Sequence, residues 1–376
     1  ATERQFRMNL VEEFREKVDR VRGLLQREAL AGVLLKRQAN FSWITCGGHN
    51  NVAMASDMAS ASVLLTPSRA ILIASNIERG RLIDEELRDI QGELEVEEYA
   101  WHQKSDFEAA NALMQTKKWG SDVPCRSART IGAPLTAIRT PLHPNEIVRY
   151  RALGRDVATV LDQTSRDLKP GLTEQEIAGR VACGLLARGV TPAVVLVAAD
   201  ERIRKYRHPV PKNGKAKKRV LIVVNAKRHG LYAAATRTVC FGKPPAALVK
   251  LHEACCRIEA AGMAAAAPDA PMGRVLQAML ARYQSEGFPE EWRLHHQGGP
   301  IGYDGRDFLL TVTGLKTPIQ ESQAFALNPS ITGAKSEDTF LAQPKGPEIL
   351  TASSGWPMIT CETPRGVIER PAMLVL

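Results

Sequence analysis

The first part of the chain alternates between helical and extended hydrophobic patterns. Residues 7–30 predict an amphipathic helix, because one stripe at helical spacing carries Leu10, Phe14, Val18, Val21 and Leu25. Short apolar runs predict strands at 32–35, 41–46, 61–67, 70–75, 94–100 and 129–134. Further helices are expected at 79–87 and 106–117. Alternation of this kind is typical of an α/β domain.

The second part opens with two helices and then changes pattern. The first helix starts near Glu146. The start of the second helix is predicted by Thr173 and Glu176, which have the spacing of a capping box. The other predicted segments are strands at 193–199, 219–226, 232–242, 308–312, 323–329, 335–342, 348–352 and 370–376, with helices at 245–265 and 272–287. This order predicts an α+β domain. Two prolines and an asparagine at 141–145 suggest a boundary there, giving domains 1–143 and 144–376.

Composition narrows the class of protein. The 376 residues are 44% hydrophobic and 24% charged, which is ordinary for a globular chain and excludes overall disorder. No apolar run approaches the roughly 18 residues of a membrane span, and the charged N-terminal segment is not expected to be a secretory signal. Seven cysteines without C-x-x-C pairs indicate reduced thiols and no zinc knuckle. These features predict a cytoplasmic protein with no membrane partner.

The net charge of +9 comes from one stretch. Residues 201–230 hold eleven Lys and Arg side chains but a single acid, Glu201. A nucleic-acid face would add interleaved aromatic residues or a groove-reading motif, and this stretch offers little beyond Tyr206. A solvated loop is therefore the preferred interpretation, and no nucleic-acid partner is expected.

Four motifs in the second part resemble those of the pita-bread superfamily, peptidase family M24, which includes methionine aminopeptidase, aminopeptidase P, prolidase and creatinase. The segment VLIVVNAKRHGLYAAATRTVCFG resembles the family's D-x-G-A-x-x-x-G-Y-x-x-D-x-T-R-T strand pair. HHQGGPIGY resembles its G-H-G-I-G loop, AFALNPSI its E-P strand and GAKSEDTFL its closing E-D-T strand. The segment AGVLL…NFSWITCGG also resembles the creatinase-type N-terminal domain. The resemblance implies an α/β creatinase-like N-terminal domain and an α+β pita-bread C-terminal domain.

The resemblance also locates the positions that hold two metal ions in the family's peptidases. The five matched ligand positions carry Val223, Ala234, Gly299, Asn328 and Glu337. Divalent metals need oxygen or imidazole donors, which Val, Ala and Gly side chains lack. The sequence therefore predicts no metal and no other cofactor.

Creatinase, which this chain resembles in both domains, cleaves a C–N bond without metal, using a histidine as acid and base. His208, in RKYRHPVP, stands at the matching place and is the candidate catalytic residue. A surface histidine in a basic loop is the alternative interpretation. Glu337 is the second catalytic candidate, orienting water or binding a cationic substrate group. A buried carboxylate at this position needs a partner, which is expected among His208, His295, His296, Arg237 and Arg306.

Five further residues are candidates for substrate binding. Arg306 suits a carboxylate, although pairing with Asp304 or Asp307 is the alternative. His295 and His296 are adjacent, so on a strand only one of them would face a pocket. The full set is Arg306, Asn328, His295, His296 and Tyr303. Cys240 and Cys361 are interpreted as core cysteines.

The function predicted from these residues is metal-independent cleavage of a C–N bond in a small polar substrate that carries a carboxylate. The alternatives are a pseudopeptidase that binds a peptide or protein, and a Xaa-Pro-type metallopeptidase. A small molecule or short peptide is the expected partner. The resemblance further implies a homodimer, with the loop 46–51 as the element that reaches toward the second chain.

Overall fold

The computed structural model describes residues 3–312 and 315–376. The chain forms two compact units, Ala1–Arg149 and Tyr150–Leu376, which are described separately below. The boundary predicted at 143/144 precedes the division between these units, which falls inside helix α6 (Pro144–Arg166).

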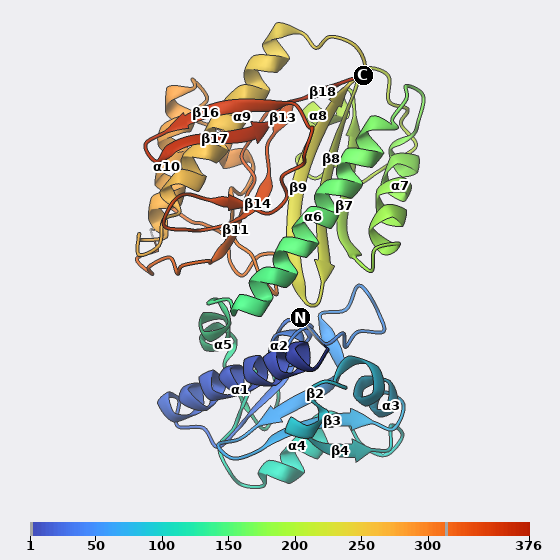
Figure 1. Ribbon diagram of the computed structural model, residues 1–376, viewed down its shortest axis with the longest axis vertical. Helices are drawn as coiled ribbons and strands as arrows, with labels where there is room; N and C mark the ends of the chain where they lie inside the picture. Colours follow the sequence, from blue (N-terminus) through green and yellow to red (C-terminus); the bar gives the residue numbers. More distant parts are fainter. Residues whose placement is uncertain (1–2, 313–314) are drawn as a thin grey trace. The chain divides into compact units, whose positions relative to one another are not determined.

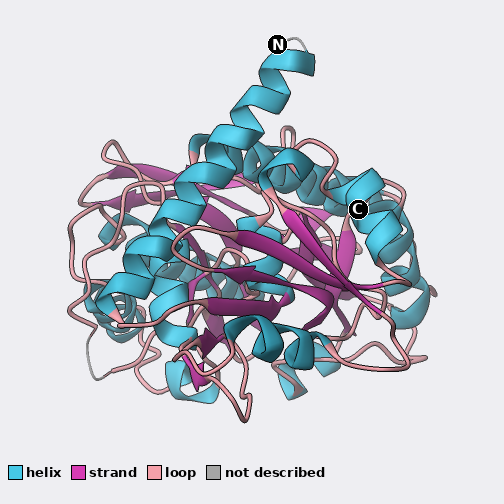
Figure 2. Ribbon diagram, turned by 90° about the horizontal axis from the view of Figure 1, so that it is seen from below, coloured by secondary structure: helices cyan, strands magenta, loops and turns pink. Residues whose placement is uncertain are grey.

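The first unit is a six-stranded mixed sheet with helices packed on it. The strand order is β4-β3-β2-β1-β5-β6. The strands are β1 (Val33–Arg37), β2 (Met58–Leu65), β3 (Ala70–Ser75), β4 (Glu95–Tyr99), β5 (Gly120–Ser121) and β6 (Arg129–Thr130). The helices are α1 (Glu3–Arg27), α2 (Gln38–Ile44), α3 (Arg79–Arg81, continued by a π-helical turn, Leu82–Glu86), α4 (Asp106–Met114) and α5 (Gly132–Arg139). A 3-10 turn, Gln91–Glu93, precedes β4. Helix α1 is the long helix that begins at the mark N in Figure 2.

Two strand predictions in this unit are wrong. The segment 41–46 belongs to helix α2, not to a strand, and every residue of α2 is buried. A short apolar run that is buried on all sides carries no periodicity, so the pattern alone cannot separate a strand from a helix. The segment 129–134 is extended only over β6, and the chain then turns into helix α5.

The second unit contains two four-stranded sheets and two short ribbons (Figure 1). One sheet has the order β18-β9-β8-β7, and the other has the order β10-β11-β14-β15. The strands are β7 (Thr191–Ala199), β8 (Arg219–Arg228), β9 (Leu231–Cys240), β10 (Gly298–Pro300), β11 (Ala324–Leu327), β14 (Asp338–Leu341), β15 (Glu348–Ile349) and β18 (Leu374–Val375). The ribbons pair β12 (Ser330–Ile331) with β13 (Ala334–Lys335) and β16 (Met358–Thr363) with β17 (Gly366–Pro371).

Helices cover both sheets of this unit. Helices α6 and α7 (Glu174–Leu186) lie along the sheet of β7, β8 and β9 (Figure 1). Helices α9 (Ala246–Ala265) and α10 (Gly273–Ser285) form an apolar core with β11, β14, β16 and β17. The remaining helices are α8 (Arg202–Lys205) and a 3-10 turn, Glu291–Leu294. The predicted capping box of α7 is confirmed: Thr173 Oγ1 accepts from the Glu176 N–H, and the Glu176 side chain accepts from the Thr173 N–H.

The strand expected at 308–312 does not form. The backbone of this segment meets β10 through one hydrogen bond, in which the Leu310 N–H donates to the Gly298 carbonyl (3.0 Å). A strand needs a continuing ladder, and the sequence pattern could not show that the partner β10 is three residues long. The segment therefore lies as a loop over β10.

All seven cysteines carry free thiols. Burial raises the pKa of the Cys361 thiol to about 12 and also raises that of Cys240, so both are inert core thiols, as predicted. Among the described residues, no helix is both long enough and apolar enough to cross a bilayer.

A buried cluster of charges joins α1 to the start of α6. Lys17 Nζ lies 2.7 Å from both Glu13 Oε1 and Glu146 Oε1. Arg149 Nη1 donates to Glu13 Oε2 (3.0 Å). Burial alone would raise the pKa of Glu13, but Lys17 and Arg149 lower it to about 2.

The Glu13 carboxylate should therefore make stability depend on pH. Because its pKa is lower in the folded state, its stabilisation is present above about pH 4.5 and is lost as the pH falls toward 2. The difference in unfolding free energy between the native chain and Glu13→Gln should therefore shrink by about 3 kcal/mol between pH 5 and 2. Urea unfolding at a series of pH values measures this, with exposed Glu12→Gln as the control. A difference that is constant with pH would contradict the assignment.

Candidate active site

Three histidine side chains gather in the second unit. His208 lies between α8 and β8, whereas His295 and His296 connect the 3-10 turn Glu291–Leu294 to β10. The Nε2 atoms of His208 and His295 are 3.1 Å apart, and all three rings offer a nitrogen within 4.8 Å of the others. His208 is exposed, His296 is intermediate and His295 is buried, so the cluster opens to solvent on the His208 side.

The expectation that only one of the adjacent histidines would face the site is wrong. Their ring centroids are 4.5 Å apart, and both rings lie near His208. The rule of opposite faces applies to extended strands. The backbone bends at His295, directly after the 3-10 turn, and strand β10 begins only at Gly298, so the two histidines do not lie on an extended strand.

Burial keeps these imidazoles neutral. The pKa of His295 falls to about 3 because of burial and the nearby Lys335. The pKa of His296 falls to about 4 through burial and the Arg306 charge, and the same kinds of effect lower the pKa of His208. At neutral pH the cluster therefore offers unprotonated ring nitrogens.

Glu337 is the carboxylate of the site. Its Oε1 accepts from Arg306 Nη2 (2.7 Å), and its Oε2 accepts from Thr236 Oγ1 (2.9 Å) and lies 2.9 Å from Lys335 Nζ. The expectation that a buried Glu337 must find a partner such as Arg306 is confirmed. Burial alone would raise the pKa of Glu337, but Lys335 and Arg306 lower it to about 2. The group is therefore a permanent anion bound to two cations.

Lys335 is a site residue that the sequence reasoning missed. Its side chain is buried against Glu337. A signal was present, because Lys335 and Glu337 are two residues apart in an extended segment, so their side chains share a face. A lysine in an otherwise buried run needs a partner of opposite charge, and the glutamate at this spacing provides it.

The other predicted residues occupy the same loops. The Asn328 N–H donates to the Gln297 carbonyl (3.2 Å), which places Asn328 beside the histidine loop. Its buried Oδ1 has no hydrogen-bond partner within residues 3–312 and 315–376. Tyr303 is buried, three residues before Arg306. Arg306 binds Glu337 rather than Asp304 or Asp307, and its Nε is also buried without a partner in the described part of the chain.

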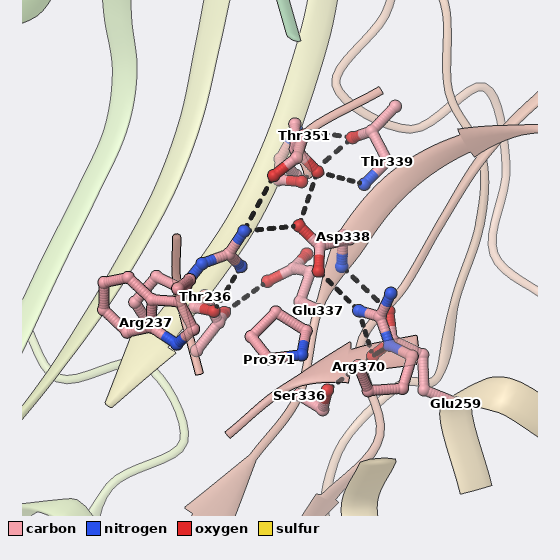
Figure 3. A network of polar contacts seen from close by, with 12 residues as sticks. Thr236, Arg237, Glu259, Ser336, Glu337, Asp338, Thr339, Thr351, Arg370 and Pro371 are labelled. Carbon is pink, nitrogen blue, oxygen red and sulfur yellow. Dashed lines mark hydrogen bonds and ion pairs between the residues drawn. The ribbon is translucent and has the colours of Figure 1, made fainter. Parts of the chain in front are cut away.

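A second buried network lies directly behind Glu337 (Figure 3). Asp338 lies between two arginines: Arg237 Nη2 donates to its Oδ1 (3.0 Å), and Arg370 Nη2 donates to its Oδ2 (2.5 Å). Thr351 also donates to Asp338 (2.5 Å), and Arg370 Nε donates to Glu259 (3.0 Å). The backbone adds a link, because the Thr236 N–H donates to the Glu337 carbonyl (2.9 Å). These contacts fix the segment that carries Glu337 against β9.

Comparison with known proteins identifies the fold that carries this site. The sequence profile of metallopeptidase family M24 matches residues 149–344, and the chain belongs to this family. No curated protein sequence matches it. The fold is that of a prolidase: an N-terminal α/β domain followed by the M24 pita-bread domain.

The similar solved structures share the whole architecture at low sequence identity. A Xaa-Pro dipeptidase from Bacillus anthracis is 15% identical, with a TM-score of 0.78 over 96% of this chain and 100% of that one. The prolidase from Pyrococcus horikoshii is 18% identical, with a TM-score of 0.74 over 90% and 99%. The N-terminal domain of the FACT complex subunit SPT16 from Cicer arietinum is 10% identical, with a TM-score of 0.70 over 92% and 97%. At these identities the likeness concerns the fold alone.

Removing the charge of Asp338 should destabilise the second unit. In Asp338→Asn the buried Arg237 and Arg370 would lose the carboxylate that balances their charges. The free energy of unfolding should therefore fall by about 3–5 kcal/mol. The matched control is Glu348→Gln, which breaks the exposed pair with Arg151 and should change stability by less than about 1 kcal/mol. Denaturant unfolding followed by tryptophan fluorescence measures both. Equal effects of the two substitutions would refute this role for the Asp338 network.

Proposed function

We propose that this chain is an M24-fold hydrolase that cleaves a C–N bond of a small, carboxylate-bearing substrate without a metal ion. The observation that carries the proposal is the joint placement of neutral His208, His295 and His296 near two cations and Glu337. This combination supplies a proton acceptor and an anion-binding group, which are the needs of acid–base cleavage of an amide or guanidino acid.

The residues present do not fit the pair of metal ions that the family implies. Val223 and Ala234, at the two aspartate positions of the resemblance, are buried and offer no donor atom. A Cβ built at Gly299, the matched histidine position, would lie only 2.5 Å from the Phe308 carbonyl oxygen, so the 308–312 loop leaves no room for a side chain there. Glu337 already binds two cations. No step of the proposed reaction therefore involves a metal pair.

The proposed reaction uses His208 as base and then as acid. Neutral His208 removes a proton from a water molecule as the water oxygen attacks the carbon of the scissile C–N bond. The protonated imidazole then gives that proton to the departing nitrogen, so the products are the acid or urea and the free amine. His295 Nε2, 3.1 Å from His208 Nε2, orients the reacting ring.

Arg306, Asn328 and Glu337 are proposed to position the substrate. The partnerless Nε–H of Arg306 points to a role in binding the substrate carboxylate, and the partnerless Asn328 Oδ1 suits a substrate N–H. Glu337 keeps Arg306 and Lys335 in place through its two ion pairs. Tyr303 belongs to the loop that carries Arg306 and is proposed to shape the site by packing.

Two other functions can be distinguished experimentally from the proposed metal-independent hydrolase. A non-catalytic role in binding a peptide or protein is favoured by the similarity to the SPT16 domain, which shows this fold in a complex subunit. It predicts binding without turnover and little effect of His208 substitution. A Xaa-Pro-type metallopeptidase is favoured by the dipeptidase neighbours, but it would require hydrolysis that depends on added Mn²⁺ or Co²⁺.

Substitution of His208 tests the catalytic proposal. N-acyl amino acids, guanidino acids and Xaa-Pro dipeptides would be screened for amine release in excess EDTA. For a substrate so found, His208→Asn should lower kcat by about 10²–10⁴-fold with the fold retained by circular dichroism. The exposed His102→Asn in the first unit should have no effect. Full turnover by His208→Asn, or amine release that appears only when EDTA is replaced by Mn²⁺ or Co²⁺, would contradict the proposal.

The proposed homodimer is tested separately. The creatinase-like resemblance leads us to propose that two chains associate and that the loop 46–51 takes part. Light scattering at micromolar concentration should give about twice the mass of one chain. The loop substitution His49→Ala, at the exposed position of this loop, should weaken association without unfolding the chain. A monomer throughout the micromolar range would rule out this assembly.

A further inference from the structure

The same three histidines have a geometry that the proposed acid–base role does not require. The ligand nitrogens of a tetrahedral zinc ion are about 3.3 Å apart, because each Zn–N bond is about 2.0–2.1 Å. The observed separation of the His208 and His295 Nε2 atoms is 3.1 Å. Ring centroids are 4.9, 5.8 and 4.5 Å apart, and the rings are inclined to one another by 39–72°. The rings are therefore not stacked in parallel, and each offers a nitrogen within 4.8 Å of the others.

We propose that His208, His295 and His296 bind one borderline transition-metal ion, with zinc as the best match, at a site separate from the metal-pair positions of the M24 family. Three imidazoles from the protein and one water would complete a tetrahedral shell, with the water on the exposed His208 side.

The surroundings of His295 suit this role. Its Nδ1 lies 3.3 Å from Ser330 Oγ, so an Nδ1–H can donate to the hydroxyl and leave Nε2 free for the metal. The Tyr283 hydroxyl accepts from the Ser330 N–H (2.9 Å) and holds this residue in place. His296 has one weak competing contact, because its Nδ1 accepts from the Gly298 N–H at 3.3 Å, and metal binding would replace that long bond.

The nearby charges select the kind of ion. Glu337 is occupied by Arg306 and Lys335, so this carboxylate is not available to Mg²⁺, Ca²⁺ or Mn²⁺, which prefer oxygen. Neutral imidazoles suit Zn²⁺, Cu²⁺ and Ni²⁺ instead. The Glu337 carboxylate neutralises one of the two charges on Arg306 and Lys335. The positive charge that remains repels every cation, so an ion that the imidazoles bind only weakly, such as Mg²⁺ or Ca²⁺, is disfavoured most.

Metal binding by the three histidines would affect the proposed reaction, but the binding does not require that the reaction takes place. A zinc ion bound to His208 would withdraw this imidazole from proton transfer, so zinc would inhibit the proposed reaction. The binding itself follows from geometry alone and can be measured on the protein without any substrate.

The test is calorimetric titration of the chelator-treated full chain with Zn²⁺, together with the visible spectrum after Co²⁺ addition. One ion per chain is expected, and Co²⁺ should give the intense visible bands of four-coordinate nitrogen ligation. Exposed His208→Ala, which should fold normally, and His296→Ala should each weaken zinc binding by more than about 100-fold. Ser330→Ala should weaken it by about 10-fold or more, as loss of an outer-shell partner does.

The controls separate this site from adventitious binding. His102→Ala and Cys183→Ser remove exposed potential ligands elsewhere and should leave affinity and stoichiometry unchanged. Zinc binding that persists in His208→Ala, or absence of binding at micromolar zinc, would overturn the proposal. Activity that requires zinc would overturn the proposed metal-independent function but support the site. Metal-free activity that zinc does not affect would count against zinc on His208 while leaving the function intact.

Discussion

The ionised Glu337 carboxylate, held between Arg306 and Lys335, is the interaction on which the candidate site depends. A buried carboxylate is costly unless it is paired, and here two cations and the Thr236 hydroxyl satisfy it. The three partners come from different places: Thr236 from β9, Arg306 from the loop after β10, and Lys335 from β13. One anion therefore joins three segments that are far apart in sequence.

The position of this carboxylate is set by the layer behind it. Glu337 and Asp338 are consecutive residues, but their side chains point to different surroundings (Figure 3). The Glu337 carboxylate belongs to the candidate site, whereas the Asp338 carboxylate binds the buried Arg237 and Arg370. This alternation is the ordinary property of an extended chain. It allows one short segment to bind the sheet of β9 on one side and to present a charge to the histidines on the other.

Much of the fold was predictable because its signals are local or are carried by motifs. The amphipathic pattern of α1 and the capping box of α7 depend on residues within a few turns. The order of four motifs led to family M24, which the family match confirms. The failures at 41–46 and 308–312 have one cause: whether an apolar run pairs with neighbouring strands is decided by distant residues, and the run itself does not contain that information.

The site was predictable in its residues but not in its contacts. The motifs pointed to His208, Glu337 and Arg306, whereas the partner that a buried Glu337 needs was left open among three histidines, Arg237 and Arg306. The sequence did not show that His295 and His296 both reach His208, because the backbone bends at His295 and is not an extended strand there. The spacing of Lys335 and Glu337 was a signal for their pairing, but it becomes specific only once both side chains are known to be buried.

We propose that this member of a metallopeptidase family binds no metal pair. The most direct measurement is anomalous X-ray diffraction at the manganese edge from crystals soaked in Mn²⁺. The account predicts no anomalous peak beside Glu337, where Arg306 and Lys335 occupy the carboxylate and Phe308 fills the space at Gly299. Two manganese peaks bridged by Glu337 would contradict it.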